Sequence, residues 1–177
     1  MIAYHLDRKK TLVSNCILDL TPTNNNNSND IYGLDNVSYF GLSRYNFLSM
    51  NEVFDYEFVN SCAIDFFVET VRYTSFPDKP SRFKSIFAVK KPEDFLLWNE
   101  YLPLNSDSVI WEIEYTHNSC FYCDARHLIG GIIFDPLQTM NAYHNYWSGI
   151  FTNNPLPELL IELPVTVKKQ FDISKLI

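Results

Sequence analysis

The chain has 177 residues, a length typical of one domain with a sizeable core. Hydrophobic residues make up 46% of it, aromatic residues 16% and charged residues 20%, which excludes an intrinsically disordered chain. The formal net charge is −7, and the few basic residues form no broad cluster, so binding to duplex nucleic acid is disfavoured.

Neither a membrane span nor an export signal is visible in the sequence. No apolar run has the length of a bilayer crossing, and the N-terminus lacks an apolar core followed by small cleavage residues. The four cysteines, at positions 16, 62, 120 and 123, are too few and too unevenly spaced for a secreted disulfide scaffold. The sequence therefore predicts a cytoplasmic protein with no membrane partner.

The first predicted strand, Ile2–Leu6, carries a histidine. Side-chain alternation places His5 and Ala3 on the face opposite the other three side chains. An imidazole there can contact a sugar hydroxyl or a phosphate. It can equally be a core or edge residue bonded to a backbone carbonyl, and the strand alone leaves both readings open.

Further elements follow from periodicity and from turn residues. Residues 12–13 predict a turn, residues 17–20 a second strand and the Asn-rich residues 21–30 a flexible loop. Apolar residues at spacings of three and four predict a helix from Asn51 to about Tyr73, and two prolines beyond it disfavour its continuation. A strand at 85–89, a second helix from Pro92 and a strand at 109–115 come next. Asp135 and Pro136 predict the start of a third helix that stops at Gly149, and two final strands span 159–167, broken at Pro164.

The string His117, Cys120, Cys123 and His127 contains four nominal zinc ligands. Its spacing is tighter than in structural zinc sites, so two inert thiols are favoured over a metal and we assign no metal. A redox role for the two cysteines is disfavoured too, because no helix N-terminus follows a strand there.

Several polar residues are candidates for chemistry, each with a structural alternative. Asp124 could stabilise a cationic transition state, or it could cap a turn or pair with Arg126; Glu114 is similarly ambiguous. Arg82 lies on a proline-stiffened segment and could grip a phosphate, or it could pair with a surface acid. Tyr143 belongs to an aromatic stretch that favours core packing over a stacking platform.

The order of these elements resembles the ADP-ribosyltransferase fold, in particular the rifampin ADP-ribosyltransferase type. The matching segments are Tyr4-His5-Leu6-Asp7 at the opening, the turn at 12–18, the strands at 86–89 and 111–115, the acidic exit Cys123-Asp124-Ala125-Arg126 and the closing strand at 163–167. The segments 76–89 and 143–149 also resemble an uncharacterised bacterial domain family with Phe-Pro-x-Lys-Pro-Ser-Arg and Tyr-Trp-Ser-Gly signatures.

The resemblance implies an α+β fold, in which residues 1–177 form one domain. This domain has a curved, split antiparallel sheet with flanking helices, and it binds NAD as the substrate. By this resemblance His5 contacts the adenosine ribose and Asp124 is the catalytic acid, with Glu114 as a second candidate. The implied cofactor-binding set also contains Arg8, Arg82, Ser85, Phe87 and Tyr143.

The expected function is transfer of ADP-ribose from NAD to an acceptor that the sequence does not identify. The family's nicotinamide-stacking tyrosine falls near Ile86, where Phe87 or a tyrosine from elsewhere in the chain could substitute for it. This departure keeps open an alternative, a noncatalytic nucleotide-binding or protein-interaction module of the same fold.

Overall fold

The computed structural model describes residues 1–8, 10–19, 56–116, 120–129 and 135–177. The Asn-rich loop predicted at 21–30 and the first residues of the helix predicted from Asn51 lie outside these ranges. The described strands are β1 (Ile2–Leu6), β2 (Ile17–Leu18), β3 (Ser85–Ala88), β4 (Ile110–Glu114), β5 (Cys120–Asp124), β6 (Pro157–Glu162) and β7 (Val165–Phe171). The described α-helices are α3 (Tyr56–Ser75) and α4 (Pro136–Trp147).

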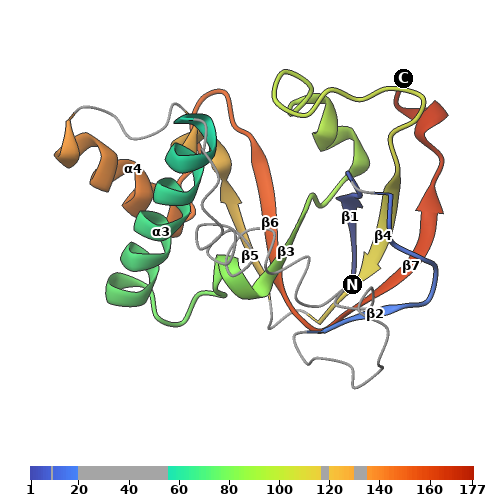
Figure 1. The fold of residues 1–177 in the computed structure, drawn as a ribbon, viewed down its shortest axis with the longest axis horizontal. Coiled ribbons are helices and arrows are strands. Elements are labelled where there is room, and N and C mark those ends of the chain that lie inside the picture. The colour runs from blue at the N-terminus through green and yellow to red at the C-terminus, as the bar shows by residue number, and fades with distance from the viewer. Residues whose placement is uncertain (9, 20–55, 117–119, 130–134) are drawn as a thin grey trace.

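The strands form two antiparallel sheets, as Figure 1 shows. One sheet has the order β1-β4-β7-β2 and the other has the order β3-β6-β5. The strands β6 and β7 are consecutive in the chain, yet each lies in a different sheet. The predicted combination of helices with antiparallel sheets is therefore confirmed.

The two sheets meet where the edge strand β1 lies beside the edge strand β3. The backbones of Tyr4 and Val89 exchange two hydrogen bonds of 2.9 and 2.8 Å there. A third hydrogen bond, 2.7 Å long, joins the His5 ring on β1 to the carbonyl of Phe87 on β3. A buried apolar cluster with members from both sheets, among them Ala3 and Ile161, continues behind this junction.

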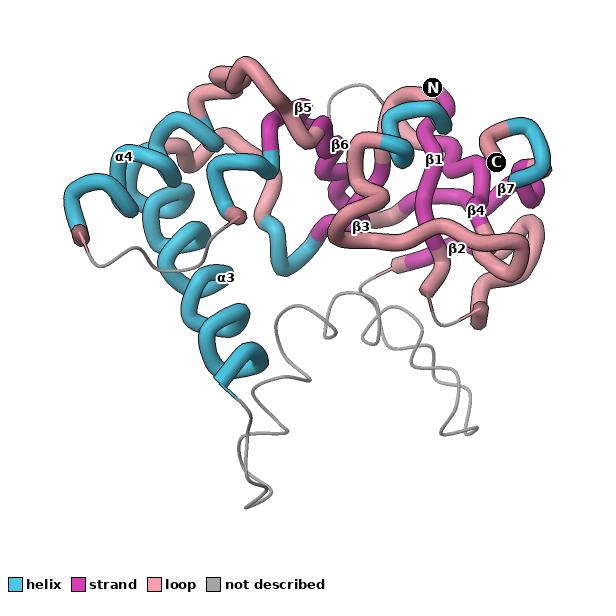
Figure 2. The backbone as a smooth tube through the Cα atoms, turned by 90° about the horizontal axis from the view of Figure 1, so that it is seen from above, coloured by secondary structure: helices cyan, strands magenta, loops and turns pink. Residues whose placement is uncertain are grey.

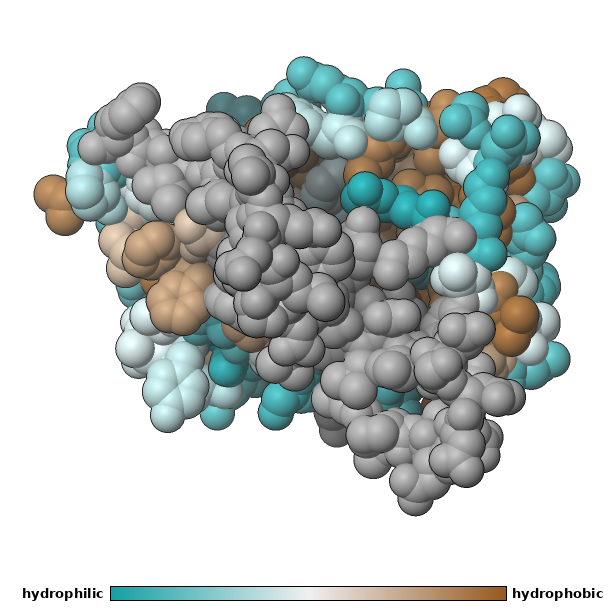
Figure 3. Space-filling view, in the orientation of Figure 1, coloured by the Kyte–Doolittle hydropathy of each residue, from teal (hydrophilic) through white to brown (hydrophobic). Residues whose placement is uncertain are grey.

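Both helices pack against the sheet β3-β6-β5, at one end of the molecule (Figure 2). Val68 and Val71 of α3 and Trp147 of α4 share a buried cluster with Leu160 of β6. The Trp147 indole also donates a hydrogen bond of 2.8 Å to the carbonyl of Val68. Other apolar side chains of α3, Phe66 and Phe67, are exposed, and Figure 3 shows a patch of moderately hydrophobic residues on this side of the molecule.

The third predicted helix and its boundaries are confirmed in α4. The Asp135 carboxylate accepts hydrogen bonds from the backbone N–H groups of Leu137 and Gln138, and Pro136 is the first helical residue. Gly149 follows the helix with a φ of +69°, in the left-handed region. No helix in the described part of the chain has the length and apolar character of a membrane span.

The second predicted helix was wrong in type. Pro92–Leu96 forms a 3-10 helix, in which Leu97 and Trp98 donate to the carbonyls three residues before them. The Trp98 indole also donates to the carbonyl of Pro157, which holds this segment against β6, and Pro103 disfavours helix beyond it.

Two features of the strands were not predicted. Cys120–Asp124 was expected to be a segment leaving the preceding strand, but it forms β5 because it pairs along its whole length with β6. The two final strands exist as predicted, with the break at Pro164. They do not pair with each other, since the chain passes from one sheet to the other at this break.

Candidate functional site

A pocket lies at the junction of the two sheets, with a volume of about 280 Å³. Most of its wall is apolar, with aromatic side chains from Phe87, Phe95 and Trp98. We call it the apolar pocket. The polar side chains that line it are His5, Arg8, Arg82 and Glu158. An enclosed apolar wall with a few converging polar groups is the usual form of a small-molecule site.

Arg82 and Glu158 form a buried ion pair in the wall of the apolar pocket. Their exposed fractions are 6% and 7%, and Arg82 Nη1 lies 2.8 Å from Glu158 Oε2. Tyr146 of α4 donates a hydrogen bond of 2.6 Å to the same carboxylate oxygen and also accepts one from Arg82. Asp65 of α3 adds a second carboxylate, 3.6 Å from Arg82 Nη2. The guanidinium stacks 4.6 Å from the ring centre of Phe87.

The pKa shifts of Arg82, Tyr146 and the neighbouring Cys123 keep these three groups protonated. Burial acts to lower the pKa of Arg82, but Tyr146, Glu158 and Asp65 outweigh it and raise that pKa well above its ordinary value. Burial raises the pKa of Tyr146, so its hydroxyl stays a neutral donor. Burial also raises the pKa of Cys123, whose neutral thiol is a poor nucleophile.

Two atoms of the ion pair have no hydrogen-bond partner among the described residues. Glu158 Oε2 is held by Arg82 and Tyr146, whereas no hydrogen bond from the described part of the chain reaches Oε1. Arg82 Nε is buried and likewise has no partner there. Both side chains line the pocket, which therefore places a carboxylate acceptor beside a guanidinium cation.

The hydrogen bond of His5 determines which of its ring nitrogens carries the proton. A carbonyl oxygen only accepts, so His5 Nδ1 must donate to the Phe87 carbonyl. Burial lowers the pKa of His5, which keeps the ring neutral near pH 7. In the neutral ring Nε2 is then an acceptor, suited to a ligand hydroxyl.

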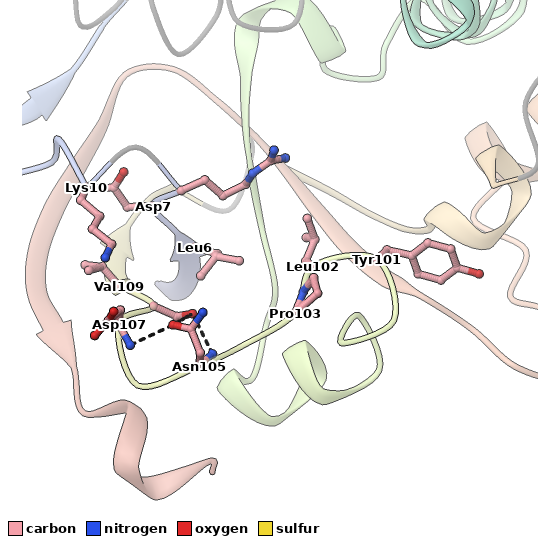
Figure 4. Close-up of a pocket in the computed structure, with 11 residues that line it drawn as sticks. Leu6, Asp7, Lys10, Tyr101, Leu102, Pro103, Asn105, Asp107 and Val109 are labelled. Carbon is pink, nitrogen blue, oxygen red and sulfur yellow. Dashed lines mark hydrogen bonds between the residues drawn. The ribbon is translucent and has the colours of Figure 1, made fainter. Parts of the chain in front are cut away.

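A second pocket, which we call the polar pocket, adjoins the first and is drawn in Figure 4. Its volume is about 390 Å³. Its charged lining residues are Asp7, Arg8, Lys10 and Asp107. The Asp7 carboxylate accepts hydrogen bonds of 2.9 and 2.8 Å from the backbone of Thr11 and Leu12.

Of the residues predicted from the sequence, the structure brings His5, Arg8, Arg82 and Phe87 together in the apolar pocket. It does not bring Asp124 there. The Asp124 side chain is fully buried, and it accepts hydrogen bonds from the backbone of Arg126, Thr152 and Leu156 and from the Thr152 hydroxyl, all between 2.7 and 2.9 Å. These bonds engage both carboxylate oxygens, so Asp124 has the capping role that the sequence left open as its alternative.

The other three candidates also lie outside the apolar pocket. Glu114 is on the exposed end of β4, where Lys168 of β7 binds it at 2.9 Å. The Ser85 hydroxyl is buried and donates to the carbonyl of Ser81 at 2.7 Å. Tyr143 belongs to the buried cluster under the helices, in line with the packing alternative.

Those residues of the string from His117 to His127 that the structure describes have separate surroundings. Cys123 is buried with its sulfur 3.9 Å from Glu158 Oε2, and His127 Nε2 lies 2.8 Å from the carbonyl of Ile150. His117 lies outside the described residues. Within the described ranges no three His, Cys, Asp or Glu side chains are grouped as metal ligands.

Glu158 is the site residue that sequence reasoning missed. It is the second residue of β6, whose other positions are mostly buried and apolar. An acid inside such a strand is rarely tolerated without a buried partner, and that was the available signal. The partner itself, Arg82, is 76 positions away in the sequence and could not be read from it.

The comparisons with known proteins agree with the extent of this fold. The model of one family matches residues 3–173, and that family is described as protein of unknown function, DUF2441. The search of curated proteins found no match.

Proposed function

The chain belongs to the DUF2441 family, and we propose that it binds NAD in the apolar pocket and transfers ADP-ribose from it to an acceptor. The observation that carries the proposal is the oxygen of the buried Glu158 that no described residue binds, on a side chain that lines the same pocket as His5. The meeting of two antiparallel sheets at this pocket supports an ADP-ribosyltransferase-like arrangement.

The pocket wall suits the nicotinamide end of NAD. The ring is planar and carries a positive charge, and the aromatic faces of Phe87, Phe95 and Trp98 can contact it. Arg82 is countered by two carboxylates, Asp65 and Glu158, so the formal charge of the network is negative and favours a cation.

The reaction breaks the glycosidic bond between the ribose and nicotinamide. The electron pair of that bond leaves with the nicotinamide, which becomes neutral, and positive charge develops on the ribose. Glu158 takes the place of Asp124 as the acid that stabilises this charge. A nucleophile of the acceptor then bonds to the same ribose carbon and releases its proton.

Two further residues would position the substrate. His5 Nε2 would accept a hydrogen bond from a ribose hydroxyl, which needs the neutral ring described above. Arg8 lines the mouth shared with the polar pocket and is available for a phosphate.

The test compares Glu158→Gln with the native chain. The amide keeps the shape of the side chain but removes its negative charge, so we expect NAD binding by calorimetry to persist while nicotinamide release falls about 100-fold. Glu162→Gln, at the far end of the same strand, is the matched control and should release nicotinamide at the native rate. The proposal fails if the native chain binds no NAD at millimolar concentration, or if Glu158→Gln is as active as the control.

The noncatalytic alternative is favoured by one observation, the absence of a tyrosine where the resemblance expects the nicotinamide to stack. Phe87 occupies that part of the wall, and the Arg82 guanidinium stacks on its ring. Tight NAD binding with no nicotinamide release from the native chain would decide for this alternative.

A further inference from the structure

We propose that the apolar and polar pockets form one continuous groove, and that the polar pocket binds the diphosphate of a dinucleotide whose ring occupies the apolar pocket. This inference rests on the proposed function, because it takes that ring to be nicotinamide. It adds a second binding site, built from Lys10 and Asn105, to which neither the family match nor the sequence pattern assigns a role.

The continuity of the groove follows from the residues that the pockets share. Leu6, Arg8 and Leu102 line both of them. Figure 4 shows Leu6 and Leu102 on facing sides of the space, one from β1 and the other from the segment before β4. A ligand that leaves the apolar pocket past Arg8 therefore enters the polar pocket directly.

The size of the apolar pocket requires such an extension. Its volume of about 280 Å³ is at the lower end for a small-molecule site. A dinucleotide carries two nucleosides joined by a diphosphate and cannot be enclosed there as a whole. The polar pocket, at about 390 Å³, adds the room that the rest of the molecule needs.

The polar pocket presents hydrogen-bond donors that suit a diphosphate. Arg8 and Lys10 are exposed and form no ion pair with any described residue. The Asn105 carbonyl oxygen accepts from the Asp107 backbone at 2.9 Å and from the Ser108 hydroxyl at 3.4 Å (Figure 4), which leaves its amide N–H₂ group, unpaired within the described residues, as a donor.

The two acids of the polar pocket balance its two cations in formal charge. Asp7 is 5% exposed, and its Oδ2 accepts hydrogen bonds from the backbone of Thr11 and Leu12, which fixes the turn that carries Lys10. Asp107 is exposed, as Arg8 and Lys10 are, so solvent and salt screen all three charges alike. The assignment therefore rests on the donors of Arg8, Lys10 and Asn105, which can bond phosphate oxygens directly, and not on a net positive charge of the pocket.

The test replaces Lys10 by asparagine. Lys10 has a φ of +56°, and asparagine tolerates this left-handed backbone, so Lys10→Asn removes the charge without adding strain. We expect the affinity for NAD and for ADP to fall roughly tenfold by calorimetry, the usual effect of losing one charged hydrogen bond. Lys169→Asn, an exposed lysine on β7 outside both pockets, is the matched control.

Ionic strength gives a second measurement that does not depend on a variant. Added salt should weaken the binding of ADP to the native chain more than to Lys10→Asn, because one phosphate contact is already missing in the variant. If Lys10→Asn binds NAD and ADP as tightly as the native chain does, the inference is overturned. In that case, nicotinamide release by the native chain and by Lys10→Asn would still support the proposed function. Lys10-dependent ADP binding without nicotinamide release supports the polar site and defeats the proposed catalysis.

Discussion

At the scale of single residues, hydrogen-bond partners decide what each buried acid does. Asp124 of β5 and Glu158 of β6 lie one register position apart, at the same end of the strand pairing, and both are buried. Asp124 has donors on both oxygens, whereas Glu158 keeps one oxygen for the pocket. The sequence located Asp124 at a strand exit and named capping as one alternative. The sequence alone does not distinguish capping from catalysis for Asp124, because the donors at Thr152 and Leu156 come from a distant loop.

We predict that Asp124→Ala destabilises the protein. The substitution leaves the buried N–H of Leu156 and the donors of Thr152 and Arg126 without their acceptor, so the free energy of unfolding should fall by about 3 kcal/mol. Urea denaturation followed by circular dichroism measures it. A loss no larger than that of an exposed acid-to-alanine control such as Asp107→Ala would contradict the structural role.

The same residue predicts a pH dependence. Burial acts to raise the pKa of Asp124, but hydrogen bonds from Thr152, Leu156 and Arg126 outweigh it and hold that pKa below its ordinary value of 3.8. The stabilisation is therefore present above that ordinary value and is lost as the pH falls through the lowered one. Native protein should lose more stability in acid than Asp124→Asn does. Parallel acid titrations of the two proteins would contradict this.

At the scale of elements, local signals predicted α4 well and the segment from Pro92 poorly. Asp135, Pro136 and Gly149 act on backbone groups a few residues away, so their effect is visible in the sequence. In contrast, the apolar residues after Pro92 fit either helix type. Their 3-10 form is accompanied by the Trp98 bond to β6, a tertiary contact that the sequence does not show.

Gly149 offers a prediction at this scale. An added Cβ would meet its nearest neighbour, the Tyr122 carbonyl oxygen, at 3.7 Å, an ordinary contact, so the cost of Gly149→Ala comes from its positive φ alone. We expect the free energy of unfolding to fall by about 1 kcal/mol. Gly149→Asn should lose less, since asparagine tolerates this conformation better. Thermal unfolding of both variants checks the order, and an asparagine variant less stable than the alanine variant would refute it.

At the scale of the whole molecule, the sequence predicted the kinds of elements but not the pocket. Antiparallel strands and flanking helices follow from patterns within each segment. The pocket follows from pairings such as His5 with Phe87, which are 82 positions apart. Its position between two sheets, and the choice of Glu158 as its acid, therefore required the structure.

The junction of the sheets should respond to pH through His5. Burial lowers the pKa of this histidine below 6.5, so the stabilisation of its neutral form is complete above that value and is lost as the pH falls through the lowered pKa. Urea denaturation from about pH 7.5 to about pH 5.5 should show a larger loss for the native chain than for His5→Gln, which can donate to Phe87 but does not titrate. Equal losses would show that His5 does not govern the junction.

The placement of β6 and β7 also determines when the protein can fold during its synthesis. These consecutive strands are interior strands of the two sheets, and β6 separates β3 from β5. A nascent chain that reaches only the end of α4 lacks the ladder partner of β3 and β5 and the partner for the outer side of β4, although β1 is already present for its junction with β3. Both sheets are therefore completed only after residues 157–171 have left the ribosome.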